Sequence, residues 1–174
     1  HEHPDVAGAV ASATDLAERF LDLDGLWHAA STRSGTVAWP DERLMPPTGT
    51  DRPVIGVIRD RAFQFYYPDN LEALEQEGAS VREINALEDR ELPEIDALYI
   101  GGGFPETQAA RLAANRTFCR SVKAAAENGL PVYAECGGLI YLGRSLRVGG
   151  ETYEMTSVLP ADFVLEQRPQ AHGY

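Results

Sequence analysis

The stretch LPVYAECGGLIYLGRSL, residues 130–146, decides the fold. Its first part, Leu130–Glu135, is a short and largely apolar run that is typical of a buried strand. Cys136-Gly137-Gly138 then interrupts the run, and LIYLGRSL continues with the apolar spacing of a helix. A strand that passes through small residues into a helix is part of a β–α unit, from which parallel sheets are built.

Further strands and helices alternate along the chain. Three more apolar runs have strand character, and a hairpin is predicted around Gly149-Gly150. The runs are VIGVI (Val54–Ile58), SVREI (Ser80–Ile84) and IDALYI (Ile95–Ile100). Helical sequence lies between them, with Asp69 as the predicted N-cap of one helix and a break at Asn115 in another. This alternation predicts an α/β fold with a parallel sheet, right-handed crossovers and helices on both faces.

The N-terminal part of the chain differs from the rest in its residue composition. Residues 1–30 contain an Ala- and Leu-rich stretch that Thr14-Asp15 and Asp24-Gly25 divide into two short predicted helices. Residues 31–53 hold four prolines among Gly, Ser and Thr, which is typical of a linker. We therefore expect a domain boundary at this linker, with the α/β domain over residues 54–174.

The composition of the chain limits the kinds of partner that it can bind. The chain has 174 residues, 44% of them hydrophobic, and a formal net charge of −12. This composition is that of a globular protein, and the charge disfavours nucleic acid or an anionic membrane as a partner. No apolar run approaches the roughly 20 residues of a membrane span. Two cysteines are too few for a disulfide scaffold, so we expect the reducing cytoplasm. The chain begins with His1, and we expect it to be a piece of a longer protein.

The turn at Cys136 has the pattern of a nucleophile elbow. In an elbow, a strand turns sharply at the nucleophile and enters a helix, so the neighbouring residues must be small. The helix N-terminus favours the thiolate form of Cys136, and the backbone N–H of Gly137 is a candidate oxyanion donor. Another predicted strand ends in a glycine run, where we expect Gly102 or Gly103 to supply the second donor.

Each of these features has a structural alternative. A lone cysteine after a strand is often a small buried hydrophobe, so spacing alone leaves the role of Cys136 open. Cys119 lies on a predicted helix with an apolar stripe, and we interpret it as a packing residue. The run Gly101–Gly103 has the composition of a phosphate cradle, but the chain contains no GxxxxGK[ST] motif. We therefore expect this chain to bind neither nucleotide nor metal.

A cysteine nucleophile normally needs a histidine as its base, and the chain has four. His1, His3 and His28 precede the linker and are poor candidates. His172, in RPQAHGY, is either the base or a solvated residue.

Three segments resemble the class I glutamine amidotransferase domain of the cobyrinate/hydrogenobyrinate a,c-diamide synthase family. They are VIGVIRDRAFQFYYPDN (54–70), ALYIGGGFPE (97–106) and YAECGGLIYLGR (133–144), in the family's order. The resemblance covers Val54 to Tyr174 and implies a flavodoxin-like parallel sheet. It also implies that residues 1–30 are the tail of an ATP-dependent synthetase domain, which would bind ATP and Mg²⁺.

The chemistry that the resemblance implies is glutamine hydrolysis. Cys136 would attack the side-chain amide of glutamine, form a glutamyl thioester and release ammonia. The ammonia would amidate the a and c acetate side chains of a corrinoid held by the synthetase domain. The family's base histidine lies in a GHEFHYS-like segment that is absent from this sequence. RPQAHGY resembles a family segment that precedes it, so His172 is disfavoured and we expect the chain alone to be inactive.

The resemblance also indicates residues at the mouth of the site. Tyr66, Tyr67 and Asn70 follow the first strand and are expected to contact glutamine or the synthetase domain. The alternative is that the tyrosines pack and Asp69 or Asn70 caps the next helix. Glu106 and Glu135 flank the glycine turns, and either would bind the glutamine α-amino group, although Glu106 also suits the first turn of a helix.

Two other functions stay open. An amidotransferase for another tetrapyrrole, of the nickel sirohydrochlorin or sirohaem type, would share this domain because the synthetase domain selects the substrate. A non-catalytic docking module would keep the elbow as structure only; the glycines beside Cys136 disfavour it, and the missing histidine favours it. Whether the chain forms a homodimer is also open.

Overall fold

The structure, a computed structural model, describes residues 6–32 and 52–166. The chain divides into two compact units, His1–Glu42 and Arg43–Tyr174. The division falls inside the predicted linker, residues 31–53, and the assignment of these parts to domains stays a prediction. The two units are described separately.

The described part of the first unit, residues 6–32, contains two helices, α1 (Val6–Phe20) and α2 (Leu23–Thr32). Two helices were predicted, but both predicted break points were wrong. The Thr14 hydroxyl donates to the Val10 carbonyl inside α1, and the Gly25 N–H donates to Asp22 Oδ1 at the start of α2. Asp22 therefore caps the second helix, because its carboxylate accepts a hydrogen bond from a backbone N–H that the first helical turn leaves free. The second helix also extends two residues into the predicted linker.

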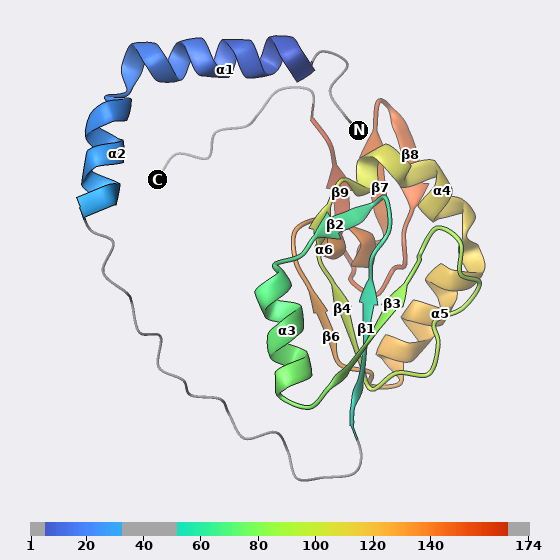
Figure 1. Cartoon of the computed structure of the whole chain (residues 1–174). Coiled ribbons are helices and arrows are strands. Elements are labelled where there is room, and N and C mark those ends of the chain that lie inside the picture. The colour runs from blue at the N-terminus through green and yellow to red at the C-terminus, as the bar shows by residue number, and fades with distance from the viewer. Residues whose placement is uncertain (1–5, 33–51, 167–174) are drawn as a thin grey trace. The chain divides into compact units, whose positions relative to one another are not determined.

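A four-stranded parallel sheet forms the centre of the second unit (Figure 1), with strand order β3-β1-β4-β6. The strands are β1 (Val54–Ile58), β3 (Ser80–Ile84), β4 (Ala97–Ile100) and β6 (Val132–Ala134). The chain crosses from β1 to β3 in one direction and from β4 to β6 in the other. Right-handed crossovers therefore place α3 (Pro68–Gln76) and α5 (Arg116–Glu127) on opposite faces. The predicted α/β class, with helices on both faces, is confirmed.

Several boundaries differ from those predicted. The helix α3 begins at Pro68, and its N-cap is Tyr67, so the prediction of Asp69 as the cap was wrong. Proline suits the first helical position because no N–H is needed there. After α6 (Gly137–Leu142) the chain enters β7 (Ser145–Val148) instead of continuing as a helix. The strand β7 pairs with β8 (Glu151–Glu154) across the predicted Gly149-Gly150 turn and with β9 (Asp162–Val164).

A break at Asn115 separates α4 (Ala109–Ala114) from α5, as predicted. The Asn115 side chain accepts a hydrogen bond from the Phe118 N–H at 3.5 Å and so caps α5. A short 3₁₀ helix, η1 (Pro105–Gln108), precedes α4. The connection from β4 to β6 is therefore helical from Pro105 to Glu127, apart from the break at Asn115.

The side chains of α5 and α6 form the core on one face of the sheet. Phe118, Val122 and Tyr141 are fully buried there, together with Ile58 and Ile100. Cys119 joins this core, with its Sγ 3.4 Å from the Tyr141 hydroxyl. Burial raises the pKa of the Cys119 thiol, so it is held neutral in the core. The prediction that Cys119 is a packing residue is confirmed.

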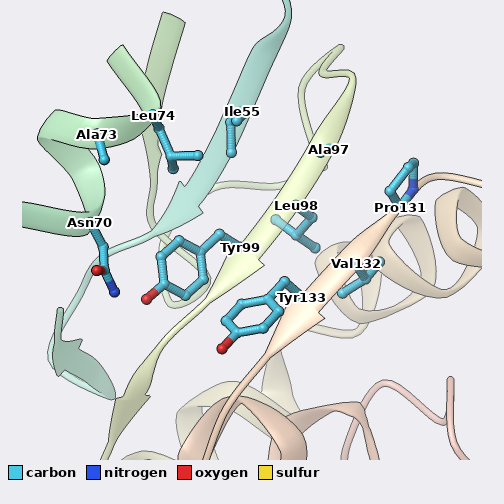
Figure 2. Close-up of a pocket in the computed structure, with 10 residues that line it drawn as sticks. All are labelled: Ile55, Asn70, Ala73, Leu74, Ala97, Leu98, Tyr99, Pro131, Val132 and Tyr133. Carbon is cyan, nitrogen blue, oxygen red and sulfur yellow. The ribbon is translucent and has the colours of Figure 1, made fainter. Parts of the chain in front are cut away.

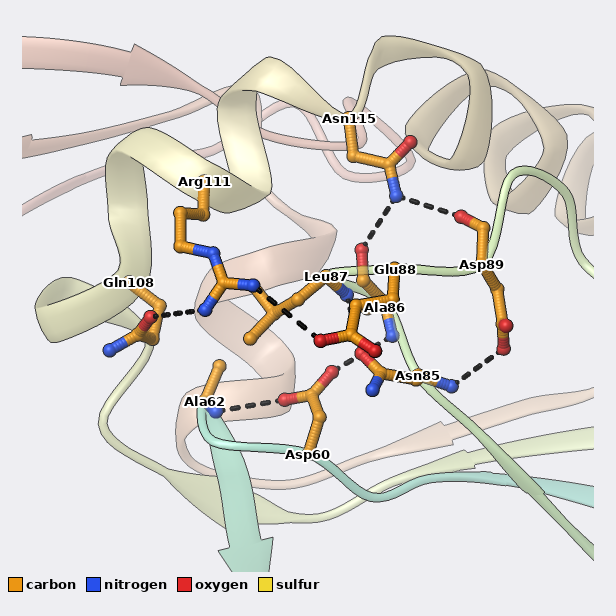
Figure 3. Close-up of polar contacts among 10 residues, drawn as sticks. All are labelled: Asp60, Ala62, Asn85, Ala86, Leu87, Glu88, Asp89, Gln108, Arg111 and Asn115. Carbon is orange, nitrogen blue, oxygen red and sulfur yellow. Dashed lines mark hydrogen bonds and ion pairs between the residues drawn. The ribbon is translucent and has the colours of Figure 1, made fainter.

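Asp60 joins the turn after β1 to the loop after β3 (Figure 3). Its carboxylate accepts hydrogen bonds from the N–H groups of Ala62 and Ala86, both at 2.8 Å. Burial raises the pKa of Asp60, and these backbone donors partly offset that effect. The amide of Asn115 holds the same loop from the other side, donating to the carbonyl of Ala86 at 2.9 Å and that of Asp89 at 2.8 Å. These contacts fix the loops at the carboxyl edge of the sheet.

Candidate active site

Cys136 lies at the sharp turn between β6 and α6. Its φ of 49° and ψ of −110° are rare for a residue with a side chain, and backbone strain of this kind is concentrated at functional positions. The thiol is exposed. The Gly138 N–H donates to the Glu135 carbonyl at 2.8 Å and the Gly101 carbonyl at 3.1 Å. The predicted elbow is therefore present, with backbone hydrogen bonds fixing its shape.

The turn requires glycine because α6 begins almost in contact with β4. A Cβ atom added to Gly138 would lie 2.4 Å from the Ile100 carbonyl oxygen, and one added to Gly137 would lie 3.1 Å from the Gly103 nitrogen. No other amino acid fits at Gly138 unless the helix moves away from the sheet.

The glycine run after β4 lies beside Cys136. Gly102 and Gly103 form β5, which pairs antiparallel with β2 (Phe63–Phe65). A Cβ atom built on Gly102 would be 3.5 Å from the Cys136 Cβ, so the two residues are neighbours. The structure thus brings together Cys136, Gly137, Gly102 and Gly103 from two strand ends, as the elbow interpretation requires. Their roles as nucleophile and oxyanion donors stay predictions.

A cavity of about 430 Å³ opens above the thiol. This volume lies within the range typical of small-molecule sites. The lining residues come from the segment after β1, the glycine loop and the elbow: Gln64, Phe65, Tyr66, Tyr67, Gly102, Glu135 and Cys136. Tyr66, Tyr67 and Glu135 are therefore placed at the same cavity as Cys136.

Asn70 and Glu106 lie elsewhere. Glu106 is in the first turn of η1 and is not part of the cavity lining. Asn70 lies on α3 beside Tyr99 and lines a second, mostly apolar cavity of about 480 Å³ (Figure 2). Of the two predicted carboxylates, only Glu135 shares the cavity with Cys136.

Tyr99 supports Glu135 and was not predicted as a site residue. Its hydroxyl donates to Glu135 Oε1 at 2.6 Å. Burial and this carboxylate raise the pKa of Tyr99 to about 12. Figure 2 shows Tyr99 and Tyr133 side by side with both hydroxyls pointing toward the carboxyl ends of their strands. The signal in the sequence was the alternation of ALYI, which places Tyr99 on the opposite face from Leu98 and Ile100.

Phe65 was also missed. Its ring lines the cavity and packs edge-on against Phe104 at 5.1 Å, and both rings are more than half exposed. Strand alternation could not have found it, because Phe63 and Phe65 are two positions apart and would share a face, whereas Phe63 is fully buried. The pairing of β2 with β5 is irregular between these two residues.

The described lining of this cavity contains no histidine. Among the described residues, His28 on α2 is the only histidine; His1, His3 and His172 fall outside the described ranges. Within residues 6–32 and 52–166, no three His, Cys, Asp or Glu side chains gather as metal ligands. Over the same ranges, no helix has the length and apolar character needed to cross a bilayer.

Comparison with known families fits this geometry. The family model of the CobB/CobQ-like glutamine amidotransferase domain matches residues 54–174, which include both glycine turns. The chain belongs to this family. The match begins at the first residue of β1 and so covers the whole described part of the α/β unit from that strand onward.

Curated relatives of this CobB/CobQ-like chain are named cobyrinate a,c-diamide synthase. The protein from Magnetococcus marinus is 41% identical over 164 residues, and the one from Listeria innocua is 49% identical over 161 residues. The alignments cover 91% and 92% of this chain but 35% of each relative. The chain therefore spans about a third of the length of these synthases.

A solved structure shows the same fold. A peptidase E protein from Listeria monocytogenes EGD-e superimposes with a TM-score of 0.51 at 15% sequence identity. The match covers 65% of this chain and 66% of that one. At this identity the likeness concerns the fold alone, and it agrees with the predicted fold class.

Proposed function

We propose that this chain performs the glutaminase step of an ATP-dependent a,c-diamide synthase. The observation that carries the proposal is the strained, exposed Cys136, at a cavity of amino-acid size with Gly102 and Gly137 beside it. Membership of the glutamine amidotransferase family and the names of the relatives support it.

The Cys136 thiolate attacks the amide carbon of the glutamine side chain. The resulting oxyanion is stabilised by the N–H of Gly137 and an N–H of the glycine loop. The C–N bond then breaks, and the nitrogen leaves as ammonia after taking up a proton. Water hydrolyses the glutamyl thioester, giving glutamate and the free thiol. Glu135, fixed by Tyr99, is the carboxylate that binds the α-amino group of glutamine.

The remaining steps belong to the synthetase part of the protein. There, ATP with Mg²⁺ activates the a and c carboxylates of cobyrinate or hydrogenobyrinate, and ammonia displaces the activating group. We place the nucleotide outside this chain because the sequence has no GxxxxGK[ST] phosphate loop. His172 is the one histidine between residues 54 and 174, and it is disfavoured as the base that the Cys136 thiol needs. We therefore also propose that the isolated chain hydrolyses glutamine poorly.

The test is labelling of the complete protein that contains this chain with diazo-oxonorleucine, an alkylating analogue of glutamine. We expect one adduct, on Cys136, with loss of glutamine-dependent amidation and retention of ammonia-dependent amidation. Cys119→Ala is the matched control and should be labelled like the wild type. An unlabelled Cys136, or glutamine-dependent activity that survives in Cys136→Ser, would contradict the proposal.

A further inference from the structure

The hydroxyl of Tyr66 bridges two strand ends beneath the glycine loop. Tyr66 directly follows β2, and its side chain turns back toward the sheet. Its Oη donates to the carbonyl of Ile58, the last residue of β1, and accepts from the Gly101 N–H at 2.8 Å. The single donor hydrogen of the phenol is therefore already used by the backbone, which leaves none for a substrate.

The ring of Tyr66 fills the space that Gly101 leaves. A Cβ atom on Gly101 would lie 2.7 Å from the Tyr66 ring, so ring and backbone are in direct contact. The ring also packs edge-on against Tyr99 at a centroid distance of 5.1 Å. Burial raises the pKa of Tyr66 well above its ordinary value, so its hydroxyl keeps its proton at any working pH.

Gly101 connects this hydroxyl to the elbow. Its N–H is held by Tyr66, and its carbonyl accepts the Gly138 N–H at 3.1 Å. The next residue, Gly102, is the neighbour of Cys136. A shift of the Gly101 peptide would therefore move the loop N–H groups relative to the reacting thiol.

We propose that Tyr66 is a positioning residue, whose hydroxyl holds the Gly101–Gly103 loop in place to stabilise the oxyanion formed at Cys136. The inference rests on the proposed glutaminase function and assigns Tyr66 to the loop instead of to glutamine or the synthetase domain. Tyr66 touches no reacting atom and acts through Gly101. Removing the hydroxyl leaves the Gly101 N–H and the Ile58 carbonyl without this partner, while the ring still fills its space.

The test is Tyr66→Phe in the complete protein. Removal of a whole oxyanion donor lowers kcat by about 100- to 1000-fold. For a donor that is displaced but present, we expect a fall of roughly 10- to 100-fold in glutamine-dependent kcat, with KM changed less than about threefold. Ammonia-dependent amidation should stay at the wild-type rate. Alkylation of Cys136 by iodoacetamide should also be unchanged, because that displacement forms no oxyanion.

The matched control is Tyr133→Phe. Tyr133 is exposed and packs edge-on against Tyr99, as Tyr66 does, so this variant should leave every rate unchanged. Amide hydrogen exchange supplies a second measurement, and we expect it to be faster at Gly101 in Tyr66→Phe. A wild-type kcat in Tyr66→Phe would overturn the inference, as would equal losses in glutamine-dependent turnover and iodoacetamide reactivity. Glutamine-dependent activity surviving in Cys136→Ser would instead overturn the proposed function.

Discussion

Gly138→Ala tests whether α6 begins as close to the sheet as the structure shows. The added methyl group would lie 2.4 Å from the Ile100 carbonyl oxygen and 2.9 Å from the Ile100 Cβ. Ordinary contacts begin near 3.4 Å, so the helix must move by about 1 Å. The obstacle includes backbone, so no rotation of a side chain relieves it.

The cost follows from this displacement. Overpacking of a tight site costs about 1–3 kcal/mol, and the hydrogen bond from the Gly138 N–H to the Gly101 carbonyl would add about 1 kcal/mol if it were lost. We therefore expect the free energy of unfolding to fall by about 2–4 kcal/mol. At a urea dependence of about 2 kcal/mol per M, the unfolding midpoint falls by about 1–2 M. A shift of about 1 Å at Cys136 should also lower glutamine-dependent turnover about 100-fold.

The assay is urea unfolding followed by circular dichroism, with turnover measured in parallel. Gly149→Ala is the matched control, because it lies in the β7–β8 turn with nothing within 4 Å of an added Cβ. Its φ of +60° makes alanine cost about 1–2 kcal/mol, without an effect on turnover. A wild-type midpoint for Gly138→Ala would refute the close approach of helix and sheet.

Two further outcomes are expected. In the native chain, iodoacetamide should modify Cys136 about 100-fold faster than Cys119, because Cys119 is 4% exposed and burial raises the pKa of its thiol. Peptide mass spectrometry measures both rates of modification. Equal rates would contradict the burial of Cys119. Asp60→Asn should lower the free energy of unfolding at pH 7 by about 1–3 kcal/mol, because Asp60 accepts from several backbone N–H groups. Burial raises the pKa of Asp60 in the folded state above its unfolded value, so proton binding stabilises the folded protein. As the pH falls from 7 toward 4, the free energy of unfolding of the wild type should therefore rise relative to that of Asp60→Asn. If urea titrations at these pH values show that this difference in the free energy of unfolding becomes smaller, the raised pKa is contradicted.

The strands of the sheet could be predicted because their signal is local. Val54–Ile58 and Ser80–Ile84 are apolar or alternating runs between turn residues, and both match β1 and β3 residue for residue. The break at Asn115 was equally readable, because an asparagine that caps a helix acts within three residues. The strand order was not predicted, because the handedness of the crossovers does not fix which strands are neighbours.

The errors arose where distant contacts decide the structure. The predicted helix after Cys136 stops at Leu142 because the chain turns at Gly143, whose added Cβ would lie 2.7 Å from the ring of Phe163, 20 positions away. Spacing within a segment cannot show such a partner. The same holds for Tyr66, whose partner Gly101 is 35 positions away, so the sequence identified the residue without its task.

The glycines of the site could be predicted, but the reason for each could not. Backbone approaches backbone at two of them: an added Cβ on Gly103 would lie 2.0 Å from the Ala62 carbonyl oxygen, and one on Gly138 would lie 2.4 Å from that of Ile100. Cys136 is thus positioned mainly by main-chain contacts, which leave little freedom to vary. The rings of Phe65 and Phe104 are exposed and carry no such constraint. We therefore expect the geometry at Cys136 to tolerate few substitutions at Gly103 and Gly138 and many at Phe65 and Phe104.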